Sequence, residues 1–532
     1  MEDHKKMELL KKNVPLAAYG PNMSMYSIAL EAWRRGLYVT FFTKKFKSSR
    51  HLRYKISDGT KTYILSQSLN YTLTPKESRR TAGKKNLTKE LFIKNNVPTP
   101  NGKMFTKSSP IEEMLDYAKT LTFPLIIKPA SSSLGKGVTI DINSIEELKV
   151  AIVESDHHKN NLIIEEQATG SDVRVFVIGD RVVSAFKRVP SHVIGDGTKN
   201  IKQLIHEKNK LRRKNPHAYG HQTKINDRIR KHLESKGLNL DTVPKKNNII
   251  TLTDSTLQAY GSETVDLTDK LSDESKQVAI DATKCLENIH VCGVDIMVDN
   301  DKKTNYVLEL NVRPYISGAM FPLTGLGRDL PGAIIDLYFP ETKVSNRSPN
   351  SYYLYYDFKL IKNSLTSGKI ARFTLPSVKT NALTYEKYSL KANAFKDRFS
   401  TWLKDRAVAL RLNGYIRMID KTAAELVVLG DQKDHDALLK KIQNHNNNDH
   451  KITIDKSDNQ PTEAIMAGFF IKKAATNQIN KNIKKQKIKI QFLTKEIKSL
   501  KKENKILIQG KNQSSITKFK KRIKKALNKP KQ

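Results

Sequence analysis

The chain has 532 residues, which is enough for two to four domains, and its formal net charge of +40 (94 Lys and Arg against 54 Asp and Glu) predicts attraction to polyanions rather than any particular fold. Two cysteines, Cys285 and Cys292, exclude a disulfide framework and argue against a structural zinc site. The first residues lack the apolar core of a signal peptide and no long apolar run follows, so we expect a cytoplasmic protein without a membrane span.

Residues 1–85 are expected to form a small α/β lobe. The apolar run 14–20 predicts a strand that ends in Gly, and Ser24 is expected to cap a helix that stops at Gly36. Residues 37–42 predict a second strand. A Gly-x-Gly-x-x-Gly turn is missing, which argues against a dinucleotide site in this lobe.

Two alternating segments joined by an acidic turn predict a hairpin with paired carboxylates. If Val298 pairs with Tyr306, then Asp295 lies opposite Glu309, and Asn311 shares the face of Glu309. Facing carboxylates repel each other, and a divalent cation would relieve the repulsion. An all-oxygen set of this kind suits Mg²⁺ or Mn²⁺. The alternative is a solvated hairpin face.

Three further segments have the chemistry of a phosphate site. Residues 125–129 predict a buried strand that carries Lys128 and enters a loop rich in Gly and Ser, whose amides could close over phosphates. Residues 162–166 predict a strand that ends in two carboxylates. Arg174 and Arg188 lie on a predicted hairpin, where either could hold a phosphate or a carboxylate. Taken singly, the Gly/Ser loop is weak evidence, since most such segments are ordinary turns, and the strand that ends in two carboxylates is better explained as a polar strand end.

Taken in order, these motifs resemble the ATP-grasp enzymes, and within them the ATP-grasp module of cyanophycin synthetase and of bifunctional glutathione synthetases. The resemblance covers residues 86–342 and is carried by the following segments: Asn86–Phe92, Ile127–Pro129, Ser133–Val138, Glu165–Arg174, Arg188–Ile201, Gly261–Asp269 and Asp295–Asn311. The chain departs from these relatives at Ser255–Gly261 and in the segment that follows Asn311, and both departures bear on the substrates.

The resemblance implies ATP and Mg²⁺ or Mn²⁺ as cofactors, with a role for each matching residue. The metal ligands would be Asp295, Glu309 and Asn311. The ATP phosphates would lie on Lys89 and Lys128, under a mobile lid that includes Ser133, Gly135, Lys136 and Gly137. Adenine would contact Glu165, Glu166, Gln167 and Ala168. The acyl phosphate and the substrate would meet Arg174, Arg188 and Arg313.

The reaction implied is an ADP-forming ligation. A carboxylate attacks the γ-phosphate, and an amine then displaces phosphate from the acyl phosphate, with small molecules or peptides as substrates. Two alternatives stay open: a nucleotide-binding scaffold without turnover, and a protein that binds an anionic polymer. No motif specific for DNA or RNA is present.

After a bridge at 343–379, residues 380–458 predict a β-α-β-β-α-β order, typical of a ferredoxin-like fold. Helices are expected at 394–411 and 434–444. The segment that ends in Met418 is similar to acylphosphatase, yet Met418 stands at that family's catalytic Asn position, and Lys391–Arg398 replaces its glycine-rich loop. A thioether cannot orient water as an amide does. We therefore expect a folded but inactive acylphosphatase-like domain.

The C-terminal segment is strongly basic and follows heptad spacing. Residues 471–510 place Ile483, Ile490, Ile497 and Asn504 at positions a, which favours a parallel two-stranded coiled coil and thus a homodimer. An amphipathic helix packed on its own chain is the alternative. Residues 511–532 form a basic tail that would bind an anionic polymer or membrane surface, or would simply be solvated.

Overall fold

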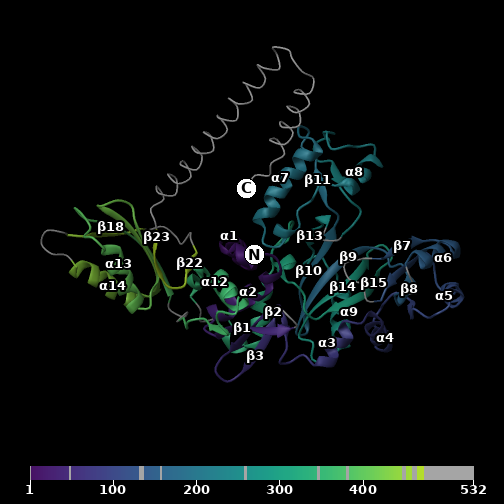
Figure 1. The fold of residues 1–532 in the computed structure, drawn as a ribbon, viewed down its shortest axis with the longest axis horizontal. Coiled ribbons are helices and arrows are strands. Elements are labelled where there is room, and N and C mark those ends of the chain that lie inside the picture. The colour runs from purple at the N-terminus through teal and green to yellow at the C-terminus, as the bar shows by residue number, and fades with distance from the viewer. Residues whose placement is uncertain are drawn as a thin grey trace, which may run out of the picture. The chain divides into compact units, whose positions relative to one another are not determined.

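The computed structural model describes residues 2–46, 49–130, 137–155, 159–256, 260–343, 348–378, 383–445, 451–457 and 464–472 (Figure 1). The chain divides into two compact units. The first spans residues 1–384 with 430–432 and 461–467, and the second spans 385–429, 433–460 and 468–532. Within the described part of the chain, none of the helices is long and apolar enough to cross a bilayer.

A five-stranded sheet forms the N-terminal part of the first unit, in the order β17-β1-β2-β3-β4. Its strands are β1 (Tyr38–Phe46), β2 (Ser49–Ser57), β3 (Thr62–Ser66), β4 (Leu69–Asn70) and β17 (Arg372–Thr374). The helices α2 (Met23–Arg34) and α12 (Phe358–Thr366) pack against it, with Tyr26, Phe41, Tyr356 and Phe358 in mutual ring contact. The segment 343–379, expected to be a bridge, thus contributes a helix and an edge strand to this lobe.

The start of the lobe differs from the expectation at two points. Residues 14–20 form no strand; two 3₁₀ helices, η1 (Leu16–Ala18) and η2 (Gly20–Asn22), follow one another instead. Prolines 15 and 21 fix φ and lack an N–H, which suits short turns rather than a ladder. Ser24 is no cap, because α2 has already begun at Met23; its buried hydroxyl accepts the Ile316 N–H at 3.1 Å.

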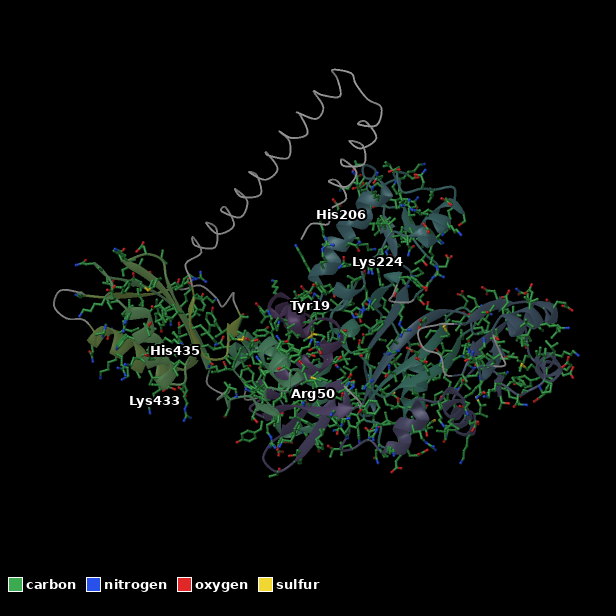
Figure 2. The ribbon with its side chains drawn as sticks, in the orientation of Figure 1. Tyr19, Arg50, His206, Lys224, Lys433 and His435 are labelled. Carbon is green, nitrogen blue, oxygen red and sulfur yellow. The ribbon has the colours of Figure 1, made fainter. Side chains whose placement is uncertain are left out.

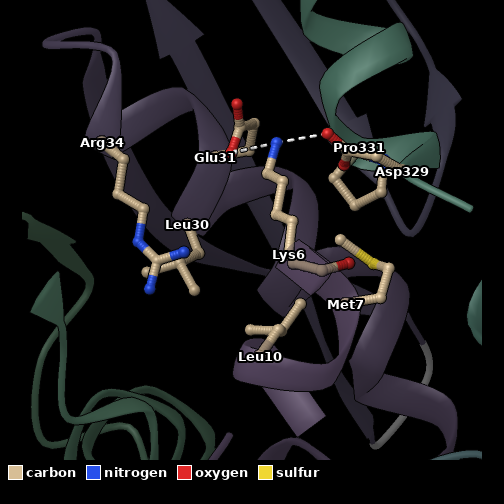
Figure 3. A pocket seen from close by; sticks show the side chains of 9 residues that line it. Lys6, Met7, Leu10, Leu30, Glu31, Arg34, Asp329 and Pro331 are labelled. Carbon is tan, nitrogen blue, oxygen red and sulfur yellow. Dashed lines mark hydrogen bonds and ion pairs between the residues drawn. The ribbon is translucent and has the colours of Figure 1, made fainter. Parts of the chain in front are cut away.

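Helix α1 (Glu2–Asn13) is held by a buried ion pair rather than by sheet contacts. The Lys6 ammonium lies 3.4 Å from Glu31 of α2 and also pairs with Asp329, which caps α11 (Leu330–Tyr338) (Figure 3). These side chains line a small cavity. Charges this deeply buried need their partners, so α1 is fixed to both helices.

Two sheets follow in the ATP-grasp segment. The first has the order β5-β8-β6-β7, comprising β5 (Gly102–Phe105), β6 (Leu125–Pro129), β7 (Thr139–Ile142) and β8 (Leu162–Glu166), with α5 (Ile111–Ala118) and α6 (Ile145–Glu154). The second has the order β13-β10-β9-β14-β15, comprising β9 (Ser171–Ile178), β10 (Arg181–Val189), β13 (Glu263–Asp266), β14 (Val291–Asp299) and β15 (Thr304–Asn311). Its apolar face packs on α9 (Asp273–Lys284); α3 (Lys76–Ala82) and α4 (Lys85–Lys94) contact β15.

A subdomain with its own core is inserted between β10 and β13. It contains β11 (His192–Ile194), α7 (Ile201–Lys214), η3 (Ala218–Gly220), α8 (Asp227–Glu234) and β12 (Ile249–Thr251), which enclose a separate apolar cluster. The fully buried guanidinium of Arg212 donates to Gly261 O at 2.6 Å and to Glu263 at 2.9 Å, and the ammonium of Lys208 lies 2.5 Å from Glu263. These contacts fix α7 to the strand β13. The short elements α10 (Ser317–Met320), η5 (Pro340–Thr342), η6 (Pro349–Tyr353), β16 (Leu354–Tyr355) and β22 (Ile465–Met466) complete the first unit.

The second unit contains the β-α-β-β-α-β order that the sequence predicts, and a strand that was not expected, β23, adds a fifth strand to its sheet. Its sheet runs β21-β18-β20-β19-β23, built from β18 (Leu383–Lys391), α13 (Phe399–Ala409), β19 (Asn413–Met418), β20 (Ala423–Asp431), α14 (Gln432–Asn444), β21 (Thr453–Lys456) and β23 (Phe469–Lys472). The first helix starts five residues later than expected, because Phe395 N–H bonds to Lys421 O and Arg398 has a left-handed φ of 65°. Residues 471 and 472 belong to β23, and the rest of the expected coiled coil and basic tail lies outside the described residues.

Candidate active site

A bulge in β15 brings two acidic residues to one face of the central sheet. Val298 pairs with Asn305, and not with Tyr306 as expected, so the ladder at the turn is displaced by one residue. An irregularity next to Asp295 then restores the expected pairing of Asp295 with Glu309. A bulge reverses which side chains face the core. Accordingly Val307 and Leu310 both pack into the apolar cluster, although they are three residues apart.

Asp295 is held by two arginines. It lies opposite Arg174 across β9 and β14, and the guanidinium of Arg174 binds both carboxylate oxygens, one of them at 2.6 Å. The guanidinium of Arg188 donates to the same carboxylate at 3.0 Å. It also donates to both carboxylate oxygens of Asp172, each at 2.9 Å. Burial alone would raise the pKa of Asp295, but the two guanidinium charges outweigh it and hold that pKa at about 2.

Glu309 lacks such compensation. Burial and the charge of Asp295 raise the pKa of the Glu309 carboxyl above its ordinary value, and the nearest cation, Lys85, lies 3.6 Å away. The side chain remains 41% exposed, so a bound ion could reach it. The side-chain amide oxygen of Asn311, the last residue of β15, accepts the Arg313 N–H at 3.0 Å.

This donor set fits a divalent cation only in part. Among the residues that the structure describes, no group of three or more His, Cys, Asp or Glu side chains is arranged to hold a metal. Glu309, Asn311 and Asp295 offer two carboxylates and an amide, and the arginines already occupy Asp295. Mg²⁺ commonly takes one or two carboxylates and completes its shell with phosphate oxygens and water. The residues therefore fit Mg²⁺ when phosphates are bound with it.

The two lysines that the sequence assigns to phosphates converge on one buried carboxylate. The ammonium of Lys89 on α4 lies 2.7 Å from Glu165, and that of Lys128 on β6 pairs with the other oxygen of Glu165. Burial would raise the pKa of Glu165, but the two lysines overcome it and lower that pKa. Glu165 thus holds both ammonium groups side by side at the end of β8.

The remaining residues of the expected adenine group lie differently. Adjacent strand residues face opposite sides of a sheet. Glu166 accordingly points away from the lysines and accepts from Asn101 at 3.0 Å and from Thr122 N–H at 2.9 Å. The Gln167 side chain exchanges two hydrogen bonds with Asp141. Ala168 follows in the connection to β9, so the contact of this group with adenine stays a prediction.

The expected lid is described only at its end. Ser133, Gly135 and Lys136 lie outside the described residues. Gly137 has a φ of 71°, and a Cβ there would lie 3.0 Å from the Pro129 ring, so both its backbone conformation and its close approach to β6 require glycine. Arg313 is exposed just after β15.

Three residues that contribute to the site were not anticipated. Asp172 binds Arg188, Lys85 approaches Glu309, and Gly102 pairs with Glu165 across β5 and β8. Asp172 lies two residues before Arg174, and a strand alternation argument places both on one face. No local pattern marks Gly102, because the partner that requires it is 63 residues further along the chain.

Replacing Gly102 by Ala is expected to destabilise the first unit by about 1–3 kcal/mol, the usual cost of an overpacked site. The added Cβ would lie 2.2 Å from Glu165 Cβ and 2.5 Å from Ile164 O, so the strands must separate where Glu165 holds the lysines. Urea unfolding measures the change. Gly220→Ala is the matched control, since nothing lies within 4 Å of its Cβ. Equal stability of the two variants would contradict the packing argument.

Comparison with known proteins defines the class. Residues 82–206 and 261–334 match the model of the RimK-like ATP-grasp domain, so this part of the chain is an ATP-grasp domain, as the motifs indicated. The unmatched residues 207–260 fall within the inserted subdomain.

The chain is also similar to individual proteins. The chain is 32% identical over 296 residues to the glutathione biosynthesis bifunctional protein GshAB of Clostridium perfringens, covering 53% of this chain and 37% of that protein. It is 30% identical over 349 residues to cyanophycin synthetase of Trichormus variabilis, covering 63% and 36% respectively. A crystal structure of a bifunctional glutathione synthetase from Pasteurella multocida aligns with a TM-score of 0.44 at 22% identity, over 54% of this chain and 40% of that one. The chain spans little more than a third of the length of these curated relatives.

Proposed function

We propose that the protein is an ADP-forming carboxylate–amine ligase that acts through an acyl phosphate. The observation that carries the proposal is the presence, within an ATP-grasp domain, of Lys89 and Lys128 gathered on Glu165 and of Glu309 opposite Asp295. The first group supplies positive charge for phosphates. The second supplies negative oxygen atoms for a metal that accompanies them. This pairing of functions is what phosphoryl transfer needs from a protein.

The residues of the chain divide the work as follows. Lys89 and Lys128 neutralise the triphosphate as the substrate carboxylate attacks the γ-phosphate. Glu309 and Asn311, beside Asp295, would hold Mg²⁺. The bound ion would offset negative charge on the phosphate oxygens. Arg174 and Arg188 are bound to carboxylates of the protein, so they contribute positive electrostatic potential at the site. Arg313 is exposed and can reach an anionic group of the substrate.

An amino acid or a peptide is the proposed substrate class. The names of the relatives point to glutathione biosynthesis and to cyanophycin synthesis. The test is ADP release from the full chain with Mg²⁺, measured over a panel of amino acids and dipeptides. The proposal requires release that depends on both a carboxylate and an amine. If the protein binds ATP but releases no ADP with any combination of carboxylate and amine, a nucleotide-binding scaffold without turnover would be favoured instead.

For the second unit we propose an acylphosphatase-like domain without hydrolase activity. Its strand order and the position of Met418 at the end of β19 support the proposal. The full chain, without ADP, is expected to release no phosphate from an acyl phosphate above the spontaneous rate, because the thioether of Met418 offers no hydrogen bond donor to position water. Phosphate assay of wild type beside a Met418→Ala variant tests this. Hydrolysis by the wild type that the variant loses would refute it.

We further propose that residues 473–510 dimerise through their heptads. The measurement is sedimentation equilibrium of this peptide in high salt, which screens repulsion between the basic helices. A dimer is expected, since Ile at a with Leu at d favours two strands. An Ile490→Lys/Ile497→Lys peptide, which places charge in the seam, should be monomeric. A monomeric wild-type peptide would leave the alternative, a helix packed on its own chain.

A further inference from the structure

The β1–β2 hairpin of the N-terminal lobe is unusually basic. Between Thr43 and Lys55 the chain has six Lys or Arg and no Asp or Glu. Lys44, Lys45 and Arg50 are exposed, and Arg50 is labelled in Figure 2 among the strands of the N-terminal sheet. The described ion pairs and hydrogen bonds include none between these three residues and the site described above, and the proposed ligation does not use them.

These charges have no acidic partners within the described parts of the chain. The ion pairs found there include none from the hairpin, whereas Lys6, Arg35, Lys61 and Arg80 of the same lobe each have one. The register also opposes two like charges, since Lys45 pairs with Arg50. Cross-strand pairs of like charge destabilise a hairpin. A ligand with closely spaced negative charges would remove that cost.

The cations lie on both faces of the ribbon. Residues paired across strands share a face, so Lys45 and Arg50 occupy one face and Lys44 with His51 the other. On the second face, Arg53 and Arg372 flank Phe42 from the two neighbouring strands. A flat anionic surface would contact the cations of only one face of the hairpin. A layer of lipid headgroups into which the hairpin inserts would contact the cations of both faces.

One aromatic ring lies beyond the charges. Phe46 at the end of β1 is 66% exposed, and its ring lies against that of His51, with 6.2 Å between centroids. Two other rings lie nearby: Phe42 is half-buried, and Tyr71 is covered by the guanidinium groups of Arg53 and Arg79 at 4.1 and 4.9 Å. Proteins that bind single-stranded nucleic acid offer successive free rings for stacking bases. This hairpin offers one ring at its end.

We propose that the β1–β2 hairpin docks the protein on anionic phospholipid, with Phe46 in the interface and Lys44, Lys45 and Arg50 among the headgroup phosphates. An exposed aromatic ring favours the boundary between water and acyl chains, and neighbouring Lys and Arg add attraction to an anionic leaflet. The surface shares no residue with the basic tail at 511–532 or with the ligase site, and the proposal does not depend on either.

Flotation of the full chain with vesicles tests the proposal. The vesicles are phosphatidylcholine alone, and equal parts phosphatidylcholine and phosphatidylglycerol. Wild type is expected to float only with the anionic vesicles. The variant Lys44→Gln/Lys45→Gln/Arg50→Gln should lower the partition coefficient by more than about tenfold, since each charge contributes near an anionic surface. Phe46→Ser should lower it by about threefold or more through loss of the ring.

The matched control removes the same charge elsewhere. Lys202→Gln/Lys210→Gln/Lys214→Gln neutralises three exposed lysines of α7 and should change the partition coefficient by less than about twofold. Thermal unfolding confirms that all variants are folded. Equal losses in both triple variants would show attraction by net charge alone and would overturn the proposal. So would failure of the wild type to float, or a hairpin variant that loses binding to a single-stranded oligouridine probe while it still floats.

Discussion

Replacing Glu309 by Gln is expected to lower ATP turnover by at least about a hundredfold while the protein stays folded, because electrostatic groups at a phosphoryl-transfer site commonly contribute that much. Glu309 is the carboxylate of the site that no arginine neutralises, and the charge of Asp295 beside it raises its pKa. The amide of Gln keeps the shape of the side chain and removes its charge. Since 41% of the Glu309 side chain is exposed, the substitution leaves no buried unpaired group.

The control for Glu309 lies in the same hairpin. Asp301 is an exposed carboxylate in the turn between β14 and β15, so Asp301→Asn removes an equal charge without touching the pair. ADP release by that variant should match the wild type. Full activity of Glu309→Gln would show that the carboxylate holds no metal, and the ligand assignment would then be wrong.

The raised pKa of Glu309 gives the activity a pH dependence. A protonated carboxyl binds a divalent cation poorly, so turnover should fall as the pH drops through the pKa of Glu309, which lies above the ordinary value for a glutamate. The apparent metal affinity should fall over the same range. Titration of activity with Mg²⁺ at several pH values separates this effect from acid unfolding. A high metal concentration should restore activity that is lost through weaker metal binding, but not activity that is lost through unfolding.

Sequence patterns predicted the paired carboxylates correctly, although two steps of the register argument were wrong. Alternation along β14 and β15 correctly placed Asp295 opposite Glu309. The assumed partner of Val298 was wrong by one residue. The bulge at Leu308 was missed as well, because no residue type in this segment marks a bulge. Two errors in register cancelled: a regular ladder drawn from the observed turn would have placed Glu309 in the apolar core.

The partners of the arginines were harder to predict. The resemblance assigned Arg174 and Arg188 to the acyl phosphate and the substrate, and that assignment stays a prediction, since a guanidinium group can bind phosphate as well as carboxylate. The structure shows both bound to carboxylates of the chain, and the choice depended on three strands meeting in one sheet. The strand β17 was missed for a similar reason: three residues carry little signal, and their partner β1 lies more than 300 residues earlier.

Asp295→Asn is expected to lower the free energy of unfolding at neutral pH by about 3–5 kcal/mol, the usual cost of removing one partner from a buried ion pair. The carboxylate is 5% exposed and binds two guanidinium groups, so the variant leaves Arg174 and Arg188 facing a neutral amide. Urea unfolding at neutral pH measures the loss, with Asp301→Asn again as the exposed control. Unchanged stability would mean that the arginines find other partners.

The pH dependence of that loss has a definite sign. The folded pKa of Asp295 is about 2, below its ordinary value of 3.8, so its contribution is complete above the ordinary value and disappears as the pH falls through the folded one. That part amounts to about 2 kcal/mol by linkage. The difference in unfolding free energy between wild type and Asp295→Asn should therefore shrink as the solution is acidified through this range.

Combining Arg174→Met with Asp295→Asn should lower the free energy of unfolding by less than the sum of the two single changes. The reason is that both partners of the pair are removed together, and Arg188 is the guanidinium left facing the neutral amide.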